Sequence, residues 1–389
     1  LLDVRLLDRG LNGTKLSKMF VDSVSEAEEV TESLGRQVRR AVELLVAAFD
    51  ESGASCVVDP RTGSPVDPSE VYEAAVCVMM RIVFLLFAQE RDLLPSGALF
   101  SMGYGLAGVL DELKARKEDE GSESMDGTSL TWHRLLATSN ALFSGATFED
   151  MRLPAYGGSV FDPARHPFLT QTDDQGALLV TVSDRVMLHV LRSVQEIAVK
   201  GDPVLRRLSF KEVDVEQIGY IYEGLLGFTC EKAPRCVVGL KGKAEDEPEV
   251  ALEDLEMLAE KSCADPVKLA KGIVDFLKNE DLLTKTAMPS AKTYEKDLKV
   301  GVTLEDQGLV LQAVRDPELQ ARLLPFMPII RRDLRGKPVV YGKGSLYVRA
   351  TSSRKDAGAH YTPRFLAEDV VRHALEPLVY NPGPHQTSD

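Results

Sequence analysis

Apolar residues recur every three or four positions through long segments of the chain, which is the spacing of one face of an α-helix. Between residues 25 and 50 this series consists of Val30, Leu34, Val38, Ala41, Leu45 and Phe49. Ser25 with Glu28 three residues later has the form of a capping box, so we expect the helix to begin at Ser25. Turn-forming residues between 59 and 68 separate it from a second predicted helix over residues 70–91. We predict that the first two hundred residues are mostly helical.

Residues 71–88 are the most apolar part of the chain and are long enough to cross a bilayer. Arg81 lies in the middle of this segment, and Glu73 lies near its start. An arginine at the centre of a membrane helix costs about 2.5–3.5 kcal/mol on insertion scales. We therefore predict a buried core helix and no membrane span.

Polar segments interrupt the helical pattern in several places. Residues 111–126 hold seven acidic and three basic side chains with glycine and serine among them, so we expect a mobile surface loop. Residues 153–168 are dense in glycine and proline and predict an irregular, compact connection, after which 183–199 returns to helical spacing. Residues 245–260 carry eight carboxylates, should form a solvated face, and open a helical region that extends to about 279.

Composition places the chain among ordinary globular proteins. Its 389 residues, 44% of them hydrophobic, are enough for two or three domains. The 46 basic and 60 acidic side chains give a net charge of −14, so the surface as a whole repels polyanions. Five scattered cysteines without paired spacing, and charged residues that interrupt any leader near Asp3 and Arg5, favour the reducing cytoplasm.

The charge balance reverses between residues 331 and 364, where nine basic residues face only Asp333 and Asp356. A local charge of about +7 is the one feature of the sequence that suits a polyanion. An alternative is a basic linker that pairs with the acidic tracts of the same protein. The candidate DNA-binding residues are Arg331, Arg332, Arg335, Lys337, Lys343, Arg349, Arg354 and Lys355.

Other chemical motifs are weak. Gly103, Gly105 and Gly108 match a dinucleotide fingerprint but follow a Pro-Ser-Gly segment rather than a strand, so we expect a flexible helix connection. Cys230 and Cys236 have no second pair of ligands at zinc-site spacing. No carboxylate cluster suggests a nuclease, and no histidine lies in a triad pattern, so we expect no metal site and no catalytic residues.

The last part of the chain carries a more specific pattern. Gly358-Ala359-His360-Tyr361-Thr362-Pro363 precedes a segment in which apolar residues from Leu366 to Leu378 recur every fourth position. Thr362 is a good N-cap and Pro363 suits the first helical position. The N-terminus of such a helix offers unpaired N–H groups to an anion, although a plain capped helix would look the same.

This segment, GAHYTPRFLAEDVV, closely resembles the motif that opens the methyltransferase domain of N6-adenine DNA methyltransferases of the gamma arrangement. Three upstream segments resemble the helical N-terminal region of large bacterial enzymes of this family, which are related to type IIG restriction-modification proteins and to the BREX and DISARM phage-defence methyltransferases. These segments are RIVFLLFAQERDLLP (81–95), LPAYGGSVFDP (153–163) and VDVEQIGYIYEGLLGF (213–228). From its own pattern, the third segment is expected to be a packing helix.

The resemblance implies a mainly α fold that leads into the first helix of an α/β Rossmann-like methyltransferase domain not contained in this chain. It also implies that double-stranded DNA is the partner, S-adenosylmethionine the methyl donor, and the N6 of a flipped adenine the acceptor. Residues that would line the cofactor are Gly358, Ala359, His360, Tyr361, Thr362 and Pro363, with Tyr361 against the methionine portion and Thr362 hydrogen-bonded. The family's D-P-A-C-G-S-G-type and N-P-P-(Y/F) motifs are absent, so this chain alone should not transfer a methyl group.

We expect three regions: a helical domain over 1–210, a second helical region with an acidic insertion over 211–330, and a basic linker with the start of the methyltransferase domain over 331–389. Two alternatives stay open. One is a type IIG fusion whose nuclease precedes Leu1. The other is a non-catalytic helical module that binds further subunits of a defence complex.

Overall fold

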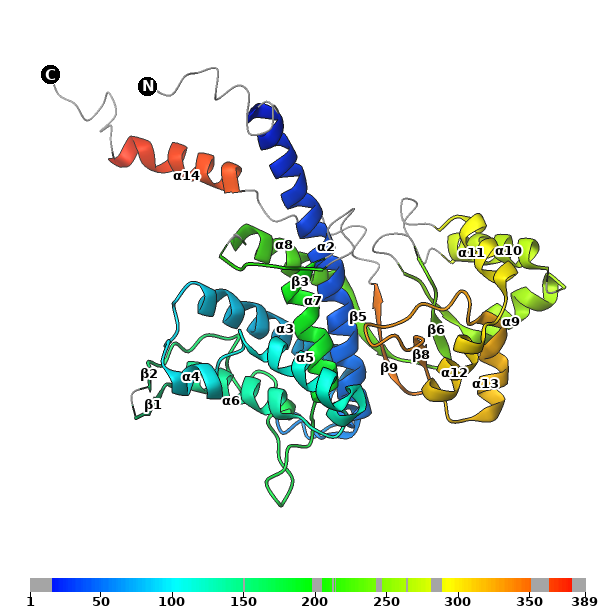
Figure 1. Cartoon of the computed structure of the whole chain (residues 1–389), viewed down its shortest axis with the longest axis horizontal. Coiled ribbons are helices and arrows are strands. Elements are labelled where there is room, and N and C mark those ends of the chain that lie inside the picture. Colours follow the sequence, from blue (N-terminus) through cyan, green and yellow to red (C-terminus); the bar gives the residue numbers. More distant parts are fainter. Residues whose placement is uncertain are drawn as a thin grey trace.

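The computed structural model describes residues 16–149, 151–197, 205–211, 213, 215–242, 247–263, 265–280, 289–350 and 364–379. As predicted, this part of the chain is mainly helical, with small sheets (Figure 1). Its helices are α2 (Leu16–Glu51), α3 (Pro68–Glu90), α4 (Ala98–Gly103), α5 (Val109–Glu120), α6 (Leu130–Ser144), α7 (Asp184–Gln195), α8 (Val215–Leu226), α9 (Leu252–Lys261), α10 (Pro266–Asn279), α11 (Ala291–Val300), α12 (Leu304–Ala313), α13 (Pro317–Leu323) and α14 (Arg364–Val379).

The strands of the described residues are short and antiparallel. They are β1 (Ala146–Phe148), β2 (Met151–Leu153), β3 (Glu196–Ile197), β4 (Arg206–Arg207), β5 (Phe228–Lys232), β6 (Val237–Gly239), β7 (Glu249–Ala251), β8 (Val340–Tyr341) and β9 (Leu346–Ala350). They pair as β1 with β2, β3 with β4, β5 with β9, and in the order β7-β6-β8.

The hydrophobic residues form two large cores, which define two bodies. The first body comprises residues 34–232 and 346–350, and the second comprises residues 236–341. In the first body α2 packs against α3, α7 and α8, and the ring of Phe49 meets that of Trp132 edge-on with the ring centroids 5.7 Å apart. In the second body α9 to α13 surround the three-stranded sheet, and the buried Tyr294 hydroxyl donates to the carbonyl oxygen of Lys241 at 2.7 Å. Figure 1 shows α2 along the boundary between the bodies.

The pairing of β5 with β9 corrects the predicted domain boundaries. Cys230 on β5 lies opposite Val348 on β9, and both side chains belong to the first core. The second body is therefore inserted between two strands of the first body. The boundary expected at 210 separates α8 and β5 from the core in which they pack, and the boundary expected at 330 separates β8 from β6, with which it pairs.

Both long N-terminal helices form where apolar spacing predicts them, but one begins elsewhere. Helix α2 begins at Leu16, so Ser25 lies inside the helix and is not its N-cap. Helix α3 follows Asp67, whose side chain accepts the N–H of Ser69, with Pro68 at the first position. Although α3 is long and apolar enough to cross a membrane, 78% of its most apolar window is buried inside the protein. Arg81 is 2% exposed within it.

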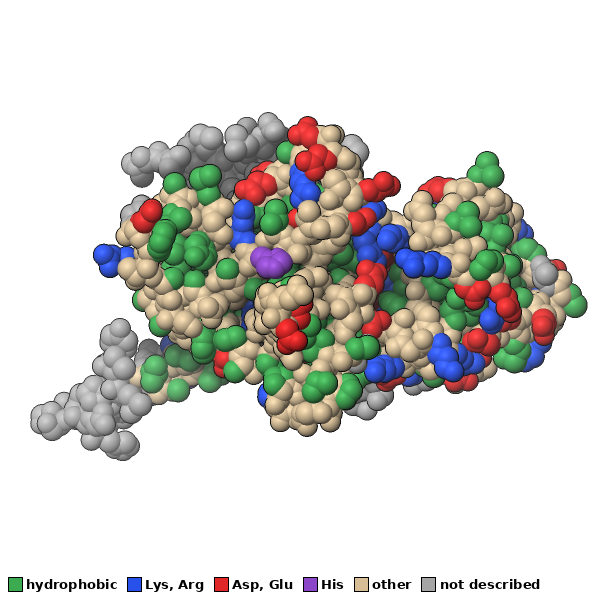
Figure 2. Space-filling model, turned by 90° about the horizontal axis from the view of Figure 1, so that it is seen from below, with side chains coloured by type: hydrophobic (Ala, Val, Ile, Leu, Met, Phe, Trp, Pro, Cys, Tyr) green, Lys and Arg blue, Asp and Glu red, His purple; other side chains and the backbone are tan. Residues whose placement is uncertain are grey.

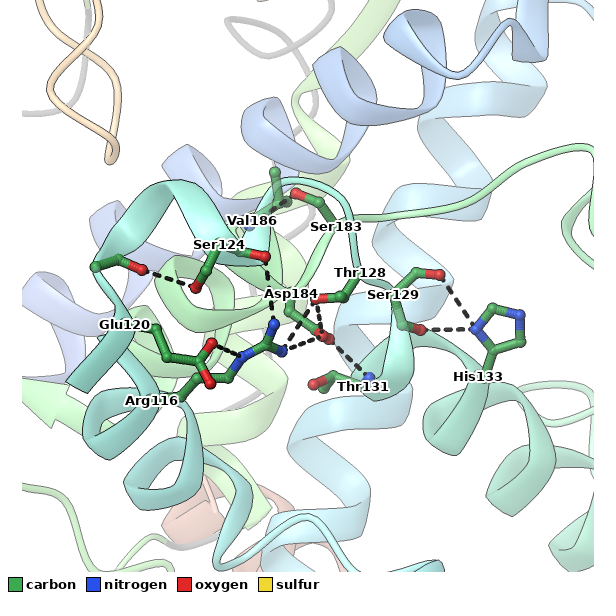
Figure 3. Close-up of polar contacts among 11 residues, drawn as sticks. Arg116, Glu120, Ser124, Thr128, Ser129, Thr131, His133, Ser183, Asp184 and Val186 are labelled. Carbon is green, nitrogen blue, oxygen red and sulfur yellow. Dashed lines mark hydrogen bonds and ion pairs between the residues drawn. The ribbon is translucent and has the colours of Figure 1, made fainter. Parts of the chain in front are cut away.

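The predicted loop at 111–126 is wrong, because α5 and a short 3-10 turn (Ser122–Met125) occupy it. Figure 3 shows why this acidic segment is ordered: the Arg116 guanidinium contacts Glu120, the Ser124 carbonyl and Asp184. The buried Asp184 carboxylate also accepts the hydroxyl of Thr128 at 2.6 Å and the N–H of Thr131 at 2.9 Å. These hydrogen bonds outweigh burial and lower the pKa of Asp184.

Several other predictions are confirmed. Residues 153–168 form an irregular connection, α7 occupies most of 183–199, and α8 packs its Leu225 into the first core. The three-glycine motif forms the connection between α4 and α5. The side-chain oxygen of Gln89, on α3, accepts hydrogen bonds from the N–H groups of Leu106 and Ala107 in this connection.

Candidate functional site

The structure places Arg331, the first residue of the basic run, in the protein interior. Its side chain bridges the two bodies: one guanidinium nitrogen lies 2.8 Å from Glu43 Oε2 on α2, and another lies 2.9 Å from Glu249 Oε1 on β7. The residue is 3% exposed. A guanidinium enclosed by carboxylates cannot reach a phosphate in this conformation, so Arg331 is withdrawn from the candidate DNA contacts. Arg331 instead pairs with Glu249 of the acidic tract at 245–260, as the alternative interpretation of the basic run predicts.

Local backbone geometry explains why Arg331 lies there. Its N–H donates to the carbonyl oxygen of Gly239 at 2.8 Å, which aligns its segment with β6. A Cβ on Gly239 would lie 2.6 Å from Arg331 Nε and 2.9 Å from a methyl group of Val339. Glycine at 239 is therefore required for the guanidinium to cross the sheet.

The pKa values of the two carboxylates paired with Arg331 are shifted in opposite directions. Burial alone would raise the pKa of Glu43, but attraction by Arg331, Arg39 and Arg40 outweighs it and lowers the pKa. Burial raises the pKa of Glu249 to about 7, because Arg331 offsets it only in part and Glu43 repels the second negative charge. This part of the acidic tract is not the solvated face that the sequence predicts.

Arg335 is also held inside the protein, and its prediction as a DNA contact is corrected in the same way. Its side chain is 9% exposed and pairs with Asp333 at 2.9 Å and Glu51 at 3.6 Å. It lines a cavity of about 140 Å³ between α2 and residues 331–346, together with Arg40 and Tyr341. This cavity is lined by fixed ion pairs.

The other basic residues lie nearer the surface. Arg332 and Arg349 have side chains 43% and 48% exposed, and they pair with Glu305 at 2.6 Å and Glu231 at 3.5 Å. Lys337 is half-buried, and Lys343 is exposed with no hydrogen bond or ion pair to the described residues. Figure 2 shows basic and acidic side chains interspersed along the junction of the bodies. The last two candidates, at 354 and 355, lie outside the described residues.

The predicted helix after the Y-T-P motif is present as α14, which begins at Arg364. The six candidate cofactor residues, 358–363, lie outside the described residues. Four large apolar side chains of α14 are exposed: Leu366, Val370, Val371 and Leu375. In Figure 1, α14 stands away from both bodies.

The structure brings together two segments that carry the family resemblance, which their separation in sequence did not predict. On α3, Cys77 Sγ and Arg81 Nε both donate to the carbonyl oxygen of Val160, at 3.3 and 2.6 Å. The rings of Phe84 and Phe161 meet edge-on, with centroids 5.2 Å apart. Arg81, the charge in the middle of the apolar helix, is the residue of this contact that already stands out in the sequence, although there it served only to argue against a membrane span.

A second polar group in this region is His166, which is buried against Glu70. Its Nδ1 lies 2.6 Å from Glu70 Oε1, and Arg61 approaches the same carboxylate at 2.9 Å. Burial outweighs the attraction of Glu70 and lowers the pKa of His166, which disfavours its protonated form. The buried contact with Glu70 gives this histidine a structural role.

No group of three or more His, Cys, Asp or Glu side chains in the described part of the chain could hold a metal ion. Comparison of the chain with protein-family models, curated proteins and solved structures finds no match. Function must therefore be argued from the chain's own residues.

Proposed function

We propose that this chain is the N-terminal portion of a site-specific adenine-N6 DNA methyltransferase of a bacterial phage-defence system. Its role is to contribute DNA binding and one edge of the S-adenosylmethionine pocket. The observation that carries the proposal is the G-A-H-Y-T-P sequence followed directly by a helix, α14, which begins one residue after Pro363.

The cofactor part of the proposal rests on the chemistry of a helix N-terminus. The first turn of α14 contains no acidic residue, so no carboxylate there repels the carboxylate of the methionine portion. In the complete enzyme S-adenosylmethionine supplies the methyl group. Tyr361 would pack against the methionine portion and Thr362 would hydrogen-bond to it.

The DNA part of the proposal rests on the basic residues that remain at the surface. Arg332, Lys337, Lys343 and Arg349 lie on the segment that leads from the second body toward α14. Phosphates bound by this segment would hold the duplex beside the methyltransferase domain. Phosphate contacts release counterions, so binding should weaken steeply with salt.

A paired substitution tests the DNA contacts. Lys343→Gln with Arg349→Gln removes two exposed charges, and should reduce the slope of log affinity against log salt by about 2, because each phosphate contact contributes about 0.9. Fluorescence anisotropy with a labelled duplex measures that slope. Lys271→Gln with Lys278→Gln, an equal change of charge on the exposed face of α10, is the control and should leave the slope unaltered. An unchanged slope in the first variant would remove this segment from the DNA interface.

One observation favours a second function, that of a helical module that binds other subunits of a defence complex. Exposed Leu366, Val370, Val371 and Leu375 give α14 apolar surface suited to a protein partner. Failure of the natural full-length protein to bind DNA or S-adenosylmethionine, with retention of a protein partner through α14, would favour this function.

A further inference from the structure

A cavity of about 310 Å³ opens in the first body, away from the basic run and from α14. It lies between α3, α6 and the irregular connection at 161–170. Its polar wall includes Arg81, Ser139, Asn140 and Thr170, and Phe161 contributes to its apolar wall. The volume is at the lower end of the range of about 300–1,000 Å³ found for small-molecule sites.

Arg81 is a buried charge without a charged partner at ion-pair distance. Although the residue is 2% exposed, no carboxylate oxygen of the described residues lies within 4.0 Å of its guanidinium. Its Nε donates to the Val160 carbonyl at 2.6 Å, and one terminal nitrogen reaches the Asp162 carbonyl at only 3.4 Å. No backbone carbonyl of the described residues accepts from the other terminal nitrogen, Nη1, and the side chain of Cys77 is the remaining polar neighbour of the guanidinium.

The charges nearest to Arg81 do not neutralise it. Among the groups that attract the guanidinium, the Cys77 side chain acts most strongly, whereas the carboxylate of Asp162 attracts it more weakly and accepts the N–H of Ala164 at 2.8 Å. Arg165 adds a second positive charge nearby. A guanidinium keeps its proton in proteins, and a buried charge is costly unless it is paired. The site therefore favours an anion.

We propose that this cavity binds the oxyanion of a small molecule, a phosphate or carboxylate group, with Arg81 as its charge partner and Asn140 as a second donor. Asn140 lines the mouth of the cavity, is exposed, and makes no hydrogen bond to the described residues. The Ser139 hydroxyl already donates to the carbonyl oxygen of Leu135 at 2.7 Å, so its proton is not available to a ligand in the cavity.

The depth and lining of the cavity define the class of ligand. The guanidinium is too enclosed to meet the backbone of a duplex, whereas a small anionic group can enter. Leu136 and Phe161 offer apolar contact to an organic remainder. This proposal can be tested separately from the proposed DNA and cofactor contacts, because its test involves neither DNA nor S-adenosylmethionine.

Titration with inorganic phosphate and with acetate tests the proposal, using calorimetry at a constant ionic strength maintained with chloride. Saturable binding of one ion per chain is expected for at least one of the two anions, and the preferred anion distinguishes a phosphate from a carboxylate ligand. The absence of saturable binding by either anion would overturn the proposal.

Variants then locate the binding. Asn140→Asp places a negative charge at the mouth and should weaken binding at least tenfold, while Asn279→Asp, the same change on exposed α10, should leave it unaltered. Arg81→Met should abolish binding, but it also removes the hydrogen bond to Val160. Asn140→Asp therefore decides the question if Arg81→Met fails to fold. Equal affinity in Asn140→Asp and in the unsubstituted protein would place the anion elsewhere and refute the proposal.

Discussion

Replacement of Arg331 by methionine should destabilise the protein strongly, because it leaves Glu43 and Glu249 buried together without their shared cation. Both carboxylates lie within 2.9 Å of the guanidinium, and their side chains are only 7% and 8% exposed. Removal of one partner from a buried ion pair typically costs about 3–5 kcal/mol. We expect a loss in that range at pH 7.5, measured by equilibrium denaturation in urea.

The loss should depend on pH. Without Arg331, the pKa of Glu249 in the folded protein should rise further above its value in the unfolded chain, and the pKa of Glu43 should rise from its lowered value, although Arg39 remains 3.2 Å from Glu43. The folded protein then holds protons that the unfolded chain has released, so its stability falls as pH rises through the raised pKa values. The loss should therefore be smaller at pH 5 than at pH 8.

Arg332→Met provides the matched control, because Arg332 is 43% exposed, pairs with the exposed Glu305, and reaches the buried Asp306 only at 3.5 Å. Surface ion pairs contribute about 0–1 kcal/mol, so this variant should lose less than 1 kcal/mol. A loss of that same small size for Arg331→Met, independent of pH, would refute the buried network. It would also restore Arg331 as a candidate for phosphate contact.

Three further perturbations test other parts of the structure. Because burial raises the pKa of Glu249 to about 7, its ionisation should lower the stability of the folded protein as pH rises from about 4.5 through 7. Glu249→Gln should flatten that decline, as measured by urea denaturation between pH 5 and 8. Gly239→Ala should destabilise the protein by about 1–3 kcal/mol, because the added Cβ would overpack against Arg331. Gly35→Ala on α2, where a Cβ meets nothing within 4 Å, should stabilise it by about 0.5–1 kcal/mol. Thermal melting that finds the Gly239 variant more stable than the Gly35 variant would contradict this geometry. Asp184→Ala removes the acceptor shared by Thr128 and Thr131, and should lower stability by at least about 1.5–3 kcal/mol, with earlier hydrogen exchange in the first turn of α6.

Apolar spacing was sufficient to predict the helices that bury a continuous face. It placed α8 correctly, where Leu225 is buried, and the continuous apolar run bounded by turn-forming residues placed α3, most of whose residues are buried. It failed at α5, where only Val109, Leu110 and Leu113 are buried and charged residues dominate the composition. That helix is held by the ion pairs and hydrogen bonds of Arg116, which depend on a residue far along the chain, Asp184.

The domain boundaries and the fate of Arg331 could not be predicted for a related reason. Strands as short as β5 and β9 have little pattern of their own, and their pairing across an entire inserted body is a tertiary event. The sequence shows that an arginine will pair with an anion, but it does not show whether that anion is a phosphate or a buried glutamate. For Arg331 the partners lie on α2 and β7, in opposite bodies of the protein.

Our central proposal is that this chain is part of an adenine-N6 DNA methyltransferase. The most direct test measures the transfer of tritium from labelled S-adenosylmethionine to unmodified bacterial DNA by the natural full-length protein, whose intact mass is determined in parallel. We predict labelled N6-methyladenine, and at least tenfold weaker cofactor binding by calorimetry in a folded Tyr361→Ala variant. A folded full-length protein that transfers no label to DNA, and binds S-adenosylmethionine equally well with and without Tyr361, would contradict the account.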